Sequence, residues 1–176
     1  MTTTMTTPTS PSDAAIVIRR ASAEDADALA ALRWEFRAAI DTPNEDRDAF
    51  LRRCAEWMRA RLGDGHAWRA WVADADGGIV GTIWLQMLEK LPNPVAEPEV
   101  HGYVTNLYVR ESARGGIGVR LLAAALDECA AAGVHQAFLW PTQRSRTLYR
   151  RAGFAGEGDV MVWTRARARA RRGPGE

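Results

Sequence analysis

The sequence lacks the cysteines, the net charge and the long apolar runs that are typical of several classes of protein. Its two cysteines, Cys54 and Cys129, are too few for a disulfide framework or a metal cluster. Its 23 basic residues are nearly balanced by 22 acidic ones, so no overall charge favours nucleic acid. No apolar run approaches the roughly 18 residues that span a bilayer. The Thr/Pro/Ser-rich start also lacks the apolar core of a signal peptide. We therefore expect a cytoplasmic protein that has no membrane partner and no metal.

What is present fits one folded domain. With 176 residues, 47% of them hydrophobic and 26% charged, the chain can bury one sizeable core. We expect the domain over residues 14–164, preceded by a disordered tail over 1–13. The arginine- and alanine-rich residues 165–176 are expected to form a basic, solvated tail. Nucleic-acid binding through that tail is the weakest of the functions considered, because the tail has no aromatic residues for stacking.

Alternating and helical apolar patterns predict a mixed α/β fold. The expected strands cover 15–20, 68–73, 79–87, 101–109, 136–140 and 159–163. The expected helices follow Ser22, run from Phe50 to Leu62 before a stop at Gly63, cover 116–132, and follow Arg144. Three prolines exclude regular structure from residues 89–99, and we expect the leucine and valine of this loop to pack on the protein.

Residues 106–122 form the most informative segment. An apolar strand is followed by a basic, glycine-rich turn and then by an amphipathic helix. Glycines at a helix start let the backbone approach a ligand and leave free N–H groups, which with the helix dipole suit phosphate oxygens. The dinucleotide fingerprint fails because Leu121 stands at its third glycine, and the ATP-type loop fails because Arg120 follows Gly118-Val119. The turn therefore indicates a pyrophosphate of another kind.

With the segment that follows, the chain resembles the GNAT superfamily of N-acetyltransferases. The resemblance covers residues 103–154 and is carried by Leu107-Tyr108-Val109, Gly116-Ile117-Gly118 and Leu148-Tyr149-Arg150-Arg151-Ala152-Gly153-Phe154. It implies an acyl-CoA N-acyltransferase fold, which has a mostly antiparallel central sheet, flanking helices and a V-shaped opening between the fourth and fifth strands. The pantetheine arm of acetyl-CoA, the expected co-substrate, would lie in that opening.

The resemblance also implies roles for individual residues. Cofactor contacts are expected from Leu107, Tyr108, Val109, Arg114, Gly115, Gly116, Ile117, Gly118, Val119, Arg120 and Thr142. A backbone N–H near Leu107–Val109 would polarise the thioester carbonyl, and the Tyr149 hydroxyl would act as general acid towards the sulfur. Two positions depart from the family pattern. Ala113 stands where relatives carry Arg or Gln, and Thr142 stands where many carry Asn.

The general base is less well defined. Thr105 and Asn106 occupy the places where many relatives carry an acid on the fourth strand, and neither can accept a proton from an amine. His101 and Glu99 are the candidates that we select, with Glu97 and Glu89 as further ones. Alternatively, the amine arrives neutral or passes its proton to water. Cys129 shares a helix face with Leu122 and Leu126, which favours a buried, inert thiol and direct transfer.

The acceptor is expected to meet the first two helices and the proline-rich loop that follows Lys90. The side chains concerned are Trp34, Glu35, Arg37 and Asp41, where rings and carboxylates would suit a cationic amine.

The sequence thus predicts an N-acetyltransferase that moves an acetyl group from acetyl-CoA to a primary amine of a small molecule or peptide. The alternative is a non-catalytic acyl-CoA sensor or partner-binding domain on the same fold. A homodimer is compatible with either.

Overall fold

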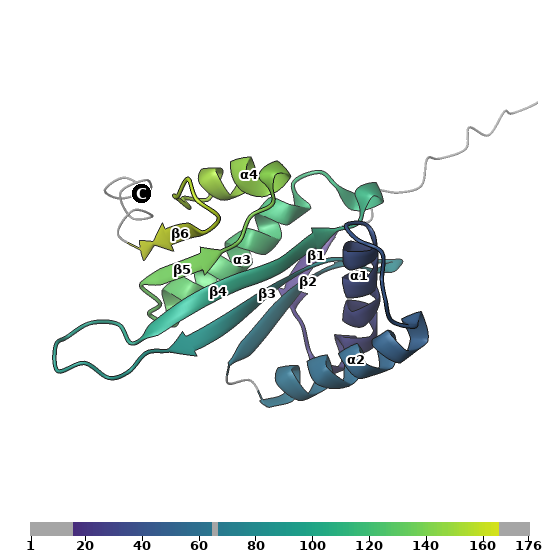
Figure 1. The fold of residues 1–176 in the computed structure, drawn as a ribbon, viewed down its shortest axis with the longest axis horizontal. Helices are drawn as coiled ribbons and strands as arrows, with labels where there is room; N and C mark the ends of the chain where they lie inside the picture. The colour runs from purple at the N-terminus through teal and green to yellow at the C-terminus, as the bar shows by residue number, and fades with distance from the viewer. Residues whose placement is uncertain (1–15, 65–66, 166–176) are drawn as a thin grey trace, which may run out of the picture.

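Six strands form one sheet in the order β1-β2-β3-β4-β5-β6 (Figure 1). The computed structural model describes residues 16–64 and 67–165. Strands β4 and β5 are parallel, and all other neighbouring strands are antiparallel. The mixed, mostly antiparallel sheet with flanking helices that the sequence predicts is therefore confirmed.

The elements alternate as expected along the chain. They are β1 (Val17–Arg20), η1 (Ala23–Asp25), α1 (Ala26–Ala38), α2 (Arg47–Asp64), β2 (Trp68–Ala75), β3 (Gly78–Glu89), β4 (Val100–Val109), η2 (Glu111–Ala113), α3 (Ile117–Ala131), β5 (Gln136–Leu139), η3 (Gln143–Ser145), α4 (Arg146–Arg151) and β6 (Met161–Thr164). Gly63 does not stop the second helix, which ends one residue later. None of the helices in residues 16–64 and 67–165 is long and apolar enough to cross a membrane.

Helices cover both faces of the sheet because alternate strand residues are apolar on each side. Trp71 and Ala73 of β2 pack in the cluster that contains α3 and α4, whereas Ala70 and Val72 pack in the cluster of α1 and α2. Helix α3 buries one stripe, which consists of Ile117, Leu121, Leu122, Ala125 and Cys129. The expected burial of the Cys129 thiol is confirmed.

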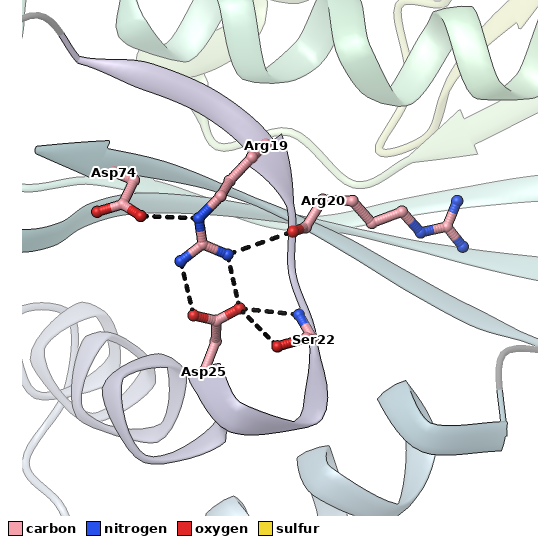
Figure 2. Close-up of polar contacts among 5 residues, drawn as sticks. All are labelled: Arg19, Arg20, Ser22, Asp25 and Asp74. Atoms are coloured by element: carbon pink, nitrogen blue, oxygen red, sulfur yellow. Dashed lines mark hydrogen bonds and ion pairs between the residues drawn. The ribbon is translucent and has the colours of Figure 1, made fainter.

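Arg19 joins the first strand to its surroundings (Figure 2). Its Nε donates to Asp74 at 2.7 Å, and its two Nη atoms donate to the Asp25 carboxylate at 2.9 and 2.8 Å. The same carboxylate accepts from the backbone N–H of Ser22 at 2.8 Å, which completes a capping box before α1. One guanidinium therefore fixes β1, β2 and the start of α1 relative to one another.

The β3–β4 hairpin projects away from the helices (Figure 1). Residues 90–99 form the expected irregular loop, but the expectation that its leucine and valine pack on the protein is wrong. Leu91 is 88% exposed and Val95 is 64% exposed. The predicted tails over 1–13 and 165–176 lie outside the described residues, except for Arg165.

Candidate active site

The end of β4 departs from regular strand geometry. Thr105 pairs with Trp84 and Tyr108 pairs with Thr82, so both Asn106 and Leu107 lie opposite Ile83. Asn106 has a φ of 53°, and no other non-glycine residue of the described chain has a positive φ. Such a β-bulge re-aims the backbone of its strand. The bulge lies within the segment whose N–H groups are expected to meet the thioester carbonyl.

On the side of β4 that faces β5, strand pairing also stops before this end of β4. The parallel ladder between β4 and β5 runs only from His101 and Gln136 to Tyr103 and Phe138. Strand β4 then continues to Val109 without a partner strand on that side among the described residues. This early end of pairing agrees with the expected opening between the fourth and fifth strands.

The glycine-rich turn presents a row of free amides at the start of α3. Gly115 and Gly116 have φ values of 145° and 91°, a left-handed backbone that favours glycine. The next two amides in the helix, those of Val119 and Arg120, both donate to the carbonyl of Gly116 at 3.1 Å. The N–H groups of residues 115–118 have no acceptor within the described chain.

This row of amides has the geometry of an anion site. Four consecutive N–H groups and the positive end of a 15-residue helix lie together. A Cβ built on Gly115 or Gly116 would meet no protein atom within 4 Å, so the space in front of the turn is open. A phosphate group can therefore approach the backbone directly.

The arginine side chains around the turn contribute less to the anion site than the sequence indicates. Arg114 forms an ion pair with Glu111 at 2.8 Å and remains 45% exposed beside the turn. The Nη2 of Arg120 donates to the carbonyl of Ile16 at 2.8 Å, which holds this guanidinium at β1. The contact between Arg120 and the cofactor stays a prediction.

Thr142 lies where the chain leaves β5 for α4. Its Oγ1 is 3.0 Å from the Oγ of Ser145, and its carbonyl accepts from the Ser145 N–H at 3.0 Å. These bonds form a turn at the start of η3 and fix the exposed hydroxyl in place.

Tyr149 lies on α4, which packs beside the glycine turn. The Cδ1 of its neighbour Leu148 lies 3.5 Å from the position of a Cβ on Gly118. Tyr149 is 8% exposed and stacks edge-on against Phe154 at 5.7 Å. Its hydroxyl has no hydrogen-bond partner in the described residues, and burial raises the pKa of Tyr149 to about 12. The phenol therefore keeps its proton at neutral pH and remains available as a donor.

The structure does not bring His101 and Glu99 to this site. A strand rises about 3.3 Å per residue, so His101 lies roughly 20 Å from Leu107 along β4. Glu99 lies farther still, in the loop, where its carboxylate accepts from the N–H of Asn93 at 3.0 Å. Glu97 forms an ion pair with Lys90 at 2.6 Å in the same loop, and Glu89 ends β3 beside it. The four candidate bases therefore lie at the opposite end of β4 from the bulge, and the identity of the general base stays a prediction.

The expected acceptor residues are partly brought together. Trp34, Arg37 and Asp41 line a cavity of ≈ 320 Å³ between the end of α1 and the start of α2. Glu35 is not free, because both its oxygens accept from Arg110, at 2.9 and 2.7 Å. The loop after Lys90 lies at the opposite end of β4 and does not line this cavity.

The sequence reasoning missed Arg33, and it did not expect the left-handed backbone of Asn106. Arg33 lines the same cavity and donates from Nη1 to Oδ1 of Asn106 at 2.9 Å. An asparagine within a predicted strand was a usable signal for a left-handed residue, because asparagine tolerates that conformation better than most residues.

A mixed sheet in which β4 and β5 pair at one end only, followed by free amides at the start of α3, matches the acyl-CoA N-acyltransferase fold of solved structures. The model of the acetyltransferase (GNAT) family matches residues 27–154 of the chain. The chain therefore belongs to the GNAT acetyltransferase family. A search of curated proteins found no match.

Solved structures support the same fold. A predicted acetyltransferase with acetyl-CoA from Clostridium acetobutylicum has a TM-score of 0.67 and 23% identity, covering 82% of this chain and 92% of its own. A GCN5-related N-acetyltransferase from Ralstonia eutropha has a TM-score of 0.64 and 28% identity, with 81% and 94% covered. PaiA N-acetyltransferase from Thermoplasma acidophilum, in complex with coenzyme A, has a TM-score of 0.63 and 20% identity, with 85% and 99% covered.

Proposed function

We propose that the protein is an acetyl-CoA-dependent N-acetyltransferase that acetylates a primary amine of a small molecule or peptide by direct transfer. The single observation that carries this proposal is the row of unpartnered amides at residues 115–118, shortly after the bulged end of β4, where the ladder to β5 has already ended. These residues fit a pyrophosphate, because the four N–H groups have no acceptor in the described chain and the Cβ positions of Gly115 and Gly116 are open. Bound there, acetyl-CoA would supply the activated acetyl thioester.

The chain's own groups would do two things. Backbone N–H groups at Leu107–Val109 would donate to the carbonyl oxygen, where negative charge develops. The Tyr149 phenol would give its proton to the departing sulfur and regain one from water. In the overall reaction one N–C bond forms and one C–S bond breaks, and the proton lost by nitrogen balances the proton gained by sulfur.

Removal of the amine proton would not need a dedicated base on β4. Thr105 and Asn106 cannot serve, and Glu35 already accepts two hydrogen bonds from Arg110. A neutral amine, or one that passes its proton to water, satisfies the same balance. The reaction would then speed up with rising pH as the fraction of neutral amine increases.

Thioester consumption against a panel of amines tests this function. We expect turnover with at least one amine, accompanied by an acetylated product in mass spectrometry. Binding of acetyl-CoA without turnover across a wide panel would instead favour the non-catalytic sensor.

A further inference from the structure

Two arginines on α1 share one face of the helix and one cavity. Arg33 and Arg37 are four residues apart, which places their side chains on the same side. Both line the ≈ 320 Å³ cavity, together with Trp34, Asp41 and Phe50 among others. The cavity is therefore lined by two guanidinium groups at one end of the helix.

Neither arginine has a carboxylate partner. No ion pair within 4.0 Å joins Arg33 or Arg37 to an acid in the described residues, whereas Arg19, Arg53 and Arg110 each have one. Burial, and next the charge of Arg37, lower the pKa of Arg33. A guanidinium nevertheless stays charged at any physiological pH. The two groups therefore bring uncompensated positive charge to the cavity wall.

The acids on the same wall do not cancel this charge. Glu45 is held by Arg53 through bonds of 3.1 and 2.6 Å. Asp41 accepts from the N–H of Thr42 at 2.8 Å and is the one remaining acid among the lining residues. Two arginines against one such acid leave the cavity with an excess of positive charge.

The cavity also connects to the reacting end of β4. The bond of 2.9 Å from Arg33 to Asn106 ties one guanidinium to the bulge, and the remaining donors of Arg33 are left for another partner. Arg33 also lies over the ring of Phe36 at 5.8 Å, which restricts its movement. A group bound by Arg33 would thus lie within a few residues of the predicted thioester position at Leu107–Val109.

We propose that the acceptor is an amine that also carries an anionic oxyacid group, a carboxylate or a phosphate, which Arg33 and Arg37 bind. The inference rests on the proposed function and defines the class of its second substrate. Guanidinium groups match both anions through paired N–H donors.

Binding is measured first, without acetyl-CoA, by titration calorimetry with matched probes. One pair is γ-aminobutyrate and butylamine, and the other is O-phosphoethanolamine and ethanolamine. We expect the member that carries the anionic group, in at least one pair, to bind about tenfold or more tightly than the amine that lacks it, as for a hydrogen bond to a charged group. The pair with the larger difference in affinity shows whether the site prefers a carboxylate or a phosphate. Equal binding within both pairs would overturn the proposal.

Two variants locate the effect. Arg37→Gln removes an exposed, unpaired charge and should not affect folding, whereas Arg52→Gln removes a similar exposed charge on α2, outside the cavity. We expect Arg37→Gln to reduce the preference for the anionic probe about tenfold and Arg52→Gln to leave it unchanged. Arg33→Gln should reduce it as well, checked against an unchanged circular dichroism spectrum. A preference that survives both cavity variants would overturn the proposal.

The same probes in the thioester assay separate this proposal from the proposed function. Equal kcat/KM for amines with and without the anionic group would leave the proposed acetyltransferase activity intact and overturn the proposal of an anionic acceptor. A preference for anionic amines that is lost in Arg37→Gln, through KM more than kcat, would support both.

Discussion

Gly116 offers the sharpest test of the anion site, because a matched control exists at the other end of the same helix. Gly116 has a φ of 91° and Gly133 a φ of 75°, and a Cβ on either would meet no protein atom within 4 Å. Replacing either by alanine should therefore cost only the strain of a left-handed residue, about 1–2 kcal/mol. For a chain of this size we expect Tm to fall by roughly 2–8 °C in both variants.

Replacement by glutamate should change the affinity for acetyl-CoA at one of the two positions only. At Gly116 the new carboxylate would point into the open space where the diphosphate is proposed to bind. Repulsion between the two charges at a few ångströms is on the order of 2–4 kcal/mol near a protein surface, which is a roughly 30- to 700-fold loss of affinity. At Gly133 the same change should leave the affinity for acetyl-CoA within about twofold, because this turn lies beyond the far end of α3.

Titration calorimetry with acetyl-CoA, run beside thermal unfolding, distinguishes the outcomes. We expect similar losses of Tm in the two glutamate variants and a loss of affinity in Gly116→Glu alone. Retained affinity in Gly116→Glu, or an equal loss in Gly133→Glu, would refute the assignment of the turn as the diphosphate site.

Three further predictions concern Tyr149, Asp25 and Cys129. Tyr149→Phe should lower kcat by about 100-fold or more while acetyl-CoA affinity changes less than twofold, and unchanged turnover would exclude the phenol from proton transfer. Hydrogen bonding from Arg19 lowers the pKa of Asp25, so its stabilisation is present above the ordinary carboxyl pKa of about 4 and is lost as pH falls through the lowered value. We expect Asp25→Asn to lower the free energy of unfolding at neutral pH by about 1–3 kcal/mol and to flatten its decline in acid, as measured by urea denaturation across pH. Burial raises the pKa of Cys129 to about 12, so this thiol should resist alkylation in the native protein, and an acetyl adduct on it in mass spectrometry would disprove direct transfer.

The sequence predicted the elements well because their signals are local. The helix start after Ser22 and the glycine turn before α3 each reflect interactions within a few residues, and the structure has both. The family motifs also predicted Tyr149 on a helix, and this helix packs beside the glycine turn. The order and spacing of the motifs in the chain are enough to predict this contact.

The errors concern contacts between residues distant in sequence. Whether Leu91 packs on the protein depends on where the β3–β4 hairpin points, and no pattern within the loop records this direction. The distance between His101 and the bulge likewise depends on how far β4 extends, and the role of His101 as general base stays a prediction. Arg33 and Arg120 show the same limit, since their partners Asn106 and Ile16 lie 73 and 104 residues away.

The projecting β3–β4 hairpin has a practical consequence. Its loop over residues 90–99 is exposed almost throughout and lies roughly 20 Å or more from Leu107 along β4. Exposed loop tips of this kind tolerate added chain and are the usual points of protease cleavage. A fluorescent label or an affinity handle spliced in at this tip should therefore leave catalysis intact. If the chain were cut in this loop, the hydrogen bonds between β3 and β4 would still hold the two new chain ends together.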